Sequence, residues 1–166
     1  MTGNKFYFSS ADKTIRVHAV EWLPVGEPKA VLQIFAGHAE QILRYEELAE
    51  YFISHGFAVI RSEHFAQEEV QFCVKSIKKK YPDIPCLLLG ICQGVPVVNE
   101  FALNHPEAVE GVVLADAEQE LHPISKELPV LRISGIIKNT REALKQICCW
   151  TEERLDEMLY RAATKQ

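Results

Sequence analysis

The sequence predicts an α/β protein: a mostly parallel sheet flanked by helices, entered through an N-terminal antiparallel hairpin. Short apolar runs of strand length recur from residue 30 onward, and segments with helical periodicity separate them. Near the N-terminus the apolar residues instead recur with period two. Strands that alternate with helices are typical of βαβ units, whereas period-two alternation is typical of half-buried antiparallel strands.

The hairpin is predicted from residues 5–9 and 15–22, which lie on either side of the polar stretch SADKT. In the second segment every other residue is apolar from Ile15 to Ala19. We therefore expect the two segments to pair with one face on the core. The stretch PVGEPK, rich in Pro and Gly, then leads into the parallel sheet.

The parallel strands are predicted from short, mostly apolar runs, as expected for strands buried on both faces. These runs are residues 30–35, 57–61, 86–90, 111–115 and 130–134. Helical spacing of apolar residues predicts helices within 42–53, 70–81 and 95–104. Near the C-terminus, Asn139 and Glu142 have capping-box spacing, and Thr151 followed by two glutamates predicts the start of a second helix there.

Composition and charge exclude several classes of function. The 166 residues contain no internal repeat or linker, so we expect one domain over residues 1–166. The net charge is −5 and the basic residues are scattered, which argues against nucleic-acid binding. No apolar segment is long enough for a membrane span, and the 5 cysteines lack C-x-x-C or zinc-ligand spacing. We expect a cytoplasmic protein with reduced thiols, no metal and no cofactor.

The stretch GICQG, residues 90–94, indicates a specialised turn. It follows a predicted strand and precedes a predicted helix, which is the context of a G-x-S-x-G nucleophile elbow with Cys92 in place of serine. Glycines on both sides have a mechanical reason, because a Cβ there would strike neighbouring backbone in so tight a turn. The alternative is a Gly-rich bend in which Cys92 is a small packing residue.

The chain as a whole resembles a known family. The stretch VLQIFAGHAEQILRYEELAEYFISHGFAVI, the elbow, and NHPEAVEGVVLADA are similar to the monoacylglycerol lipase and lysophospholipase-like branch of the α/β-hydrolase superfamily, over roughly residues 5–135. The resemblance implies an α/β-hydrolase fold with Cys92 as nucleophile. It also implies an oxyanion hole made by the backbone N–H groups of His38 and Gln93.

The departures from the family pattern concern the other catalytic residues. Ala36 stands where the family's loop has histidine, and the short stretch EQELHPISKEL stands where the family has a cap. No acidic residue follows residue 134 at the family's position, and no histidine follows His122. The resemblance therefore implies that the cap and the last strand are missing, that the usual triad is incomplete and that the site is open.

Other residues are candidates for the vacant catalytic roles. Asp116 follows the strand at 111–115, where some members of the superfamily carry the acid. His38, His64 and His122 each follow a predicted strand, at the edge where α/β sites assemble. A thiolate needs less activation than a serine hydroxyl. We expect His64 or His122 to pair with Cys92 and Asp116 to orient it; the alternative is that all three are ordinary loop residues.

Two functions from different classes remain open. The first is a hydrolase or acyl-transfer enzyme in which Cys92 attacks a small ester or thioester substrate. The second is a catalytically silent α/β-hydrolase-fold protein that binds a ligand or a partner. The strand at 130–134 is expected at an open edge of the sheet, and together with the C-terminal helices it predicts a homodimer.

Overall fold

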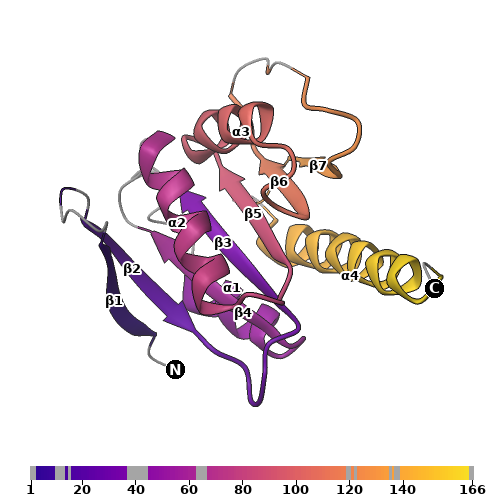
Figure 1. Ribbon diagram of the computed structural model, residues 1–166, viewed down its shortest axis with the longest axis horizontal. Coiled ribbons are helices and arrows are strands. Elements are labelled where there is room, and N and C mark those ends of the chain that lie inside the picture. The colour runs from indigo at the N-terminus through magenta and orange to yellow at the C-terminus, as the bar shows by residue number, and fades with distance from the viewer. Residues whose placement is uncertain are drawn as a thin grey trace.

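The computed structural model of the chain describes residues 3–9, 14, 16–36, 45–62, 67–118, 121, 123–134, 136 and 139–164. Its strands are β1 (Asn4–Ser9), β2 (Arg16–Trp22), β3 (Ala30–Ala36), β4 (Phe57–Ser62), β5 (Cys86–Ile91), β6 (Gly111–Ala115) and β7 (Val130–Ile133). They form one sheet in the order β1-β2-β4-β3-β5-β6-β7 (Figure 1). Each predicted strand is present, and each of its ends lies within one residue of the predicted end.

The sheet has an antiparallel and a parallel part. β1 pairs with β2, and β2 with β4, in antiparallel register. From β4 through β3, β5, β6 and β7 every pair is parallel. The mostly parallel sheet and its antiparallel hairpin are therefore confirmed, and the carboxyl ends of β3 to β6 lie along one edge.

Helices cover both faces of the sheet. They are α1 (Tyr45–Ile53), α2 (Gln67–Lys80), α3 (Gly94–Asn104) and α4 (Thr140–Thr164). α2 and α3 pack on one face, and α1 and α4 pack on the other (Figure 1). Because side chains alternate along a strand, β3 serves both cores: Leu32 packs toward α1 and α4, and Phe35 toward α2 and α3.

The C-terminal helix differs from the prediction. We expected a new helix to start at Thr151, but α4 is continuous over this position. The Thr151 side chain is buried and its hydroxyl donates a hydrogen bond to the carbonyl of Cys148, at 2.8 Å. A threonine that bonds to the preceding turn of its own helix does not cap a new one. The prediction was wrong because capping residues are also tolerated inside helices when their hydroxyl is bonded in this way.

The described part of the chain contains no helix that is long and apolar enough to cross a membrane. All 5 cysteines are described, and each is present as a thiol without a disulfide.

Candidate functional site

Cys92 lies on the turn between β5 and α3, as GICQG predicts. Its φ is +49°, in the left-handed region that residues with a Cβ rarely adopt. Its N–H donates to the carbonyl of Ala115, at 2.9 Å, and its carbonyl accepts from the N–H of Val95, at 3.1 Å. The first bond holds the turn against β6 and the second begins α3. The turn therefore places Cys92 at the carboxyl end of β5 and the N-terminus of α3.

The two flanking glycines fit the turn for a steric reason. A Cβ on Gly94 would overlap the carbonyl oxygen of Phe35, at the end of β3. A Cβ on Gly90 would lie 2.9 Å from the carbonyl oxygen of Gly94. The backbone of α3 therefore approaches β3 and β5 more closely than any other residue type permits.

Asp116 occupies the equivalent place on the neighbouring strand. Ile91 of β5 and Ala115 of β6 are register partners. Cys92 follows Ile91 and Asp116 follows Ala115, so the two residues occupy matching positions after adjacent strands. Asp116 has a φ of +55°, and it and Cys92 are the described non-glycine residues with positive φ. Left-handed residues of this kind concentrate at functional sites. One carboxylate oxygen of Asp116 accepts a hydrogen bond from the N–H of Ile136, at 2.9 Å.

The remaining predicted site residues divide into two groups. Gln93 is described, and it lies between Cys92 and the first turn of α3 with its side chain exposed. His38, His64 and His122 lie outside the described residues, so their roles stay predictions. The structure thus brings Cys92, Gln93 and Asp116 together at the carboxyl edge of the sheet.

The thiols differ in their protonation. Burial raises the pKa of Cys73 and of Cys86 to about 12, and the pKa of Cys148 to about 11. These three remain protonated at neutral pH. Cys92 is itself 8% exposed, and the open site stays a prediction because the loops that follow β3 and β4 lie outside the described residues.

Relatives and solved structures are consistent with this geometry. No family model matches the chain. A monoglyceride lipase homolog of monkeypox virus is 28% identical over 136 residues, which is 68% of this chain and 49% of the viral protein. Human monoglyceride lipase is 31% identical over 110 residues, or 56% of this chain and 36% of the human enzyme.

Among solved structures, a thermostable carboxyl esterase from Bacillus coagulans superposes with a TM-score of 0.59 at 21% identity. The match covers 70% of this chain and 44% of the esterase. The chain is similar in sequence to monoglyceride lipases and has the fold of an α/β-hydrolase sheet. The resemblance stated from the sequence is confirmed.

The chain spans about half the length, or less, of the curated relatives it matches. The same holds for the structure of a soluble variant of yeast monoglyceride lipase, which has a TM-score of 0.55 at 14% identity and is covered to 47%.

Proposed function

We propose that the protein is an ester or thioester hydrolase, or a related acyl-transfer enzyme, with Cys92 as its nucleophile. The observation that carries the proposal is the left-handed backbone of Cys92 on a turn that only its flanking glycines permit. Such a conformation costs on the order of 1–3 kcal/mol and persists where the surrounding structure enforces it. The names of the relatives, monoglyceride lipase and carboxyl esterase, favour a small carboxylic ester as substrate.

In the proposed reaction, the Cys92 thiolate attacks the carbonyl carbon of the ester and forms a C–S bond. The carbonyl π electrons move to the oxygen, where the N–H groups of Gln93 and His38 would hold the negative charge. Collapse of this intermediate breaks the C–O bond, and a histidine, His64 or His122, protonates the leaving alkoxide. Water then hydrolyses the acyl thioester and restores the thiol.

The position of Cys92 at the N-terminus of α3 supports the thiolate as nucleophile. The first turn of a helix presents backbone N–H groups that no carbonyl of the helix satisfies, and the helix dipole there is positive. Both favour a negative charge on the sulfur and on the nearby oxyanion.

One observation favours the alternative of a catalytically silent binding protein. The Asp116 carboxylate already accepts a hydrogen bond from the Ile136 N–H. In that alternative, Asp116 serves to hold Ile136 after β7.

The test is acylation of the intact protein by a short p-nitrophenyl ester, followed by mass spectrometry and a turnover assay. We expect the wild type to gain the mass of one acyl group and to release p-nitrophenol. Cys92→Ala should lose both, and Cys92→Ser should retain little turnover, because a serine needs a stronger general base. Cys149→Ala, which removes the exposed thiol, is the matched control. Acylation that persists in Cys92→Ala, or that never occurs in the wild type, would reject Cys92 as the nucleophile.

A further inference from the structure

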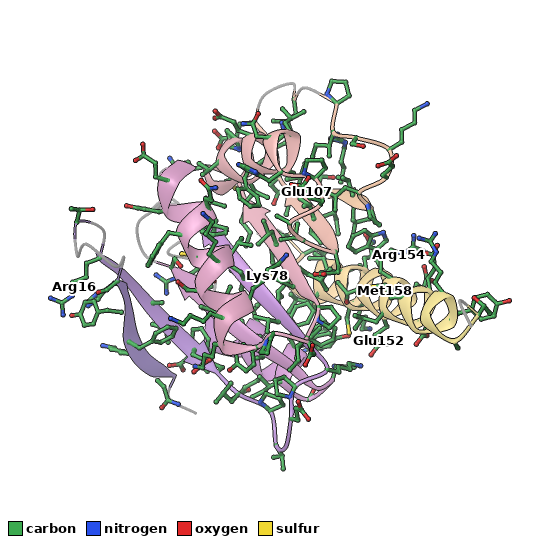
Figure 2. The ribbon with its side chains drawn as sticks, in the orientation of Figure 1. Arg16, Lys78, Glu107, Glu152, Arg154 and Met158 are labelled. Carbon is green, nitrogen blue, oxygen red and sulfur yellow. The ribbon has the colours of Figure 1, made fainter. Side chains whose placement is uncertain are left out.

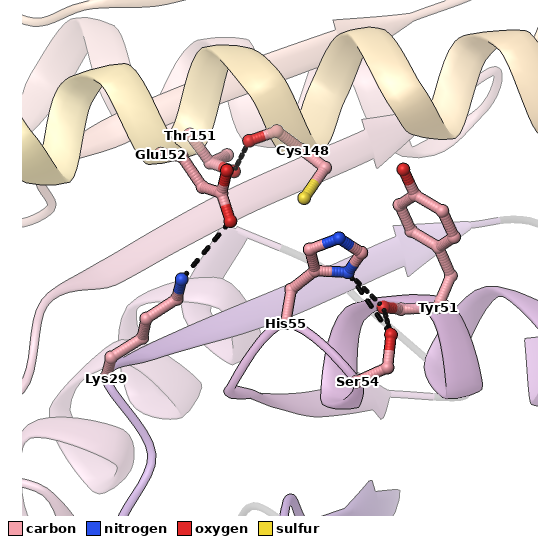
Figure 3. Close-up of polar contacts among 7 residues, drawn as sticks. All are labelled: Lys29, Tyr51, Ser54, His55, Cys148, Thr151 and Glu152. Carbon is pink, nitrogen blue, oxygen red and sulfur yellow. Dashed lines mark hydrogen bonds and ion pairs between the residues drawn. The ribbon is translucent and has the colours of Figure 1, made fainter.

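Three side chains that commonly bind metals converge at the edge of the sheet opposite to Cys92 (Figure 3). His55 lies between α1 and β4, while Cys148 and Glu152 both belong to α4. One nitrogen of His55, the sulfur of Cys148 and one carboxylate oxygen of Glu152 all lie within 4.8 Å of one another. This group lies near the amino ends of the parallel strands, whereas Cys92 follows the carboxyl end of β5.

The three residues are held by well-packed elements. Cys148 and Glu152 are four residues apart in a continuous helix, so their side chains lie on the same face. The α1 helix, which ends just before His55, shares a core with α4 through Phe52 and Ile147. The N–H of His55 donates to the carbonyl of Phe52, at 3.0 Å, which fixes the backbone of the turn. The cluster is therefore preorganised by two helices that already pack together.

The orientation of the His55 ring suits a metal ligand. Its Nδ1 lies 2.8 Å from the carbonyl oxygen of Tyr51 and 3.2 Å from the hydroxyl of Ser54. A carbonyl oxygen only accepts, so Nδ1 carries a proton, and in the neutral imidazole Nε2 then has the lone pair. Figure 3 shows the other ring nitrogen on the side that faces Cys148. Histidines that ligate metals usually donate their second N–H to a carbonyl or a carboxylate in this way.

Glu152 lies on the side of the cluster that faces solvent. One of its carboxylate oxygens pairs with the ammonium of Lys29 at 3.3 Å, and the two side chains are 41% and 46% exposed. An ion pair this exposed contributes little free energy, so a divalent cation can replace Lys29. Lys29 and Glu152 also line a cavity of about 660 Å³ whose wall includes Leu155 and Met158 of α4. Figure 2 shows Glu152 and Met158 on this helix. Of the three cluster residues, Glu152 is the one that borders this cavity.

We propose that His55, Cys148 and Glu152 form a zinc site that fastens α4 to the turn between α1 and β4. Thiolate, imidazole and carboxylate are the side-chain ligands of Zn²⁺, and three of them with one water complete a tetrahedron. Bonds of about 2.0–2.3 Å require ligand atoms roughly 3.3–3.7 Å apart, so the side chains must close by about 1 Å. The flexible, half-exposed Glu152 supplies much of this movement. The thiol proton leaves to solvent as the Zn–S bond forms.

The site is tested on the full chain with Co²⁺ alone and Zn²⁺ alone as probes. Cobalt bound to a thiolate has an intense near-ultraviolet charge-transfer band, and tetrahedral cobalt has visible bands. We expect both in the wild type, and we expect Zn²⁺ to remove them and to raise the thermal midpoint. Cys148→Ser should lose the charge-transfer band, while His55→Gln and Glu152→Gln should weaken binding at least 10-fold. Circular dichroism verifies that each variant is folded, and the exposed Glu152 makes Glu152→Gln the variant least disturbing to the fold.

Matched controls come from the neighbouring residues. Cys149 and Glu153 repeat the same spacing one residue further along α4, with both side chains exposed. Cys149→Ser and Glu153→Gln should therefore bind cobalt as the wild type does, and so should Cys92→Ala, which separates this site from the proposed active site. A wild type without the charge-transfer band at micromolar cobalt would overturn the proposal. So would a band that survives in Cys148→Ser or disappears in Cys149→Ser.

Discussion

The carboxylate of Asp116 accepts a hydrogen bond from the backbone N–H of Ile136, at 2.9 Å, and this bond ties the end of β6 to the chain that follows β7. The N–H of Asp116 in turn donates to the carbonyl of Ile133, also at 2.9 Å. Ile136 is fully buried in the core shared by α1 and α4. Asp116 therefore organises the segment that leads into α4, whatever its part in chemistry.

Two substitutions of Asp116 separate its structural role from a catalytic one. Asp116→Asn keeps an acceptor oxygen and tolerates the left-handed backbone, so we expect a stability loss of about 1 kcal/mol or less. Asp116→Ala loses the acceptor and strains the backbone, and should cost about 2–4 kcal/mol. Urea denaturation measures both. If Asp116 orients a histidine, Asp116→Asn should also lose most of the esterase activity while it remains folded; unchanged turnover in that variant assigns Asp116 to structure alone.

Gly94→Ala should disrupt the elbow. The new methyl group would overlap the Phe35 carbonyl, which belongs to a central strand and cannot move away. We expect a loss of about 3 kcal/mol or more in the free energy of unfolding. Gly26→Ala is the control: Gly26 has a positive φ, +83°, which Gly94 does not have, but no atom lies within 4 Å of its added Cβ. That variant should lose only about 1 kcal/mol. Similar losses for the two would show that the contact with Phe35 is not tight.

The buried thiols predict a loss of stability in alkali. Burial raises the pKa of Cys73 and Cys86 from 9.0 to about 12, so the unfolded chain releases these protons at lower pH than the folded one. The free energy of unfolding therefore does not depend on the ionisation of these two thiols below pH 9, and it falls between pH 9 and about 12. Each thiol should lower the free energy of unfolding by about 1.4 kcal/mol per pH unit in that window.

Urea midpoints at pH 8, 9 and 10 measure this slope. Cys148, whose pKa is raised to about 11, contributes to the same slope, so Cys73→Ala should make it shallower by about a third of the thiol contribution. Cys149→Ala, at an exposed position, should leave it unchanged. A slope that is the same in Cys73→Ala and the wild type would contradict the assignment to buried thiols.

The edge strand predicts self-association. β7 is the last strand of the sheet on its side, and its neighbour in the chain, α4, extends past the sheet (Figure 1). In the described part of the chain no strand pairs with the outer edge of β7, and an unpaired strand edge beside a helix favours a two-fold contact with a second copy. We expect light scattering at micromolar concentration to give twice the chain mass of 18.9 kDa. Arg132→Pro, on the exposed side of β7, should shift the protein toward monomers; a monomeric wild type would refute the prediction.

The sequence predicted the elements that have strong local signals. The apolar runs of β3, β5 and β6 are buried along their whole length, which is why hydrophobic pattern alone located them. The elbow was predictable because two glycines at fixed spacing have a steric cause. The cluster at His55 had no such signal: His55 is remote in sequence from Cys148, and only the packing of α1 against α4 brings the two together. Residues Cys148 and Glu152, one helical turn apart, were the one hint available.

The continuity of α4 has a mechanical consequence. The helix begins shortly after Ile136, at the carboxyl edge of the sheet, and passes Cys148 and Glu152 at the opposite edge. Its 25 residues make a rod roughly 37 Å long. Because Thr151 lies inside this rod and no break divides it, α4 has no hinge between the two edges. A displacement of α4 at Glu152 is therefore transmitted along the whole helix toward Ile136, whose backbone N–H binds Asp116.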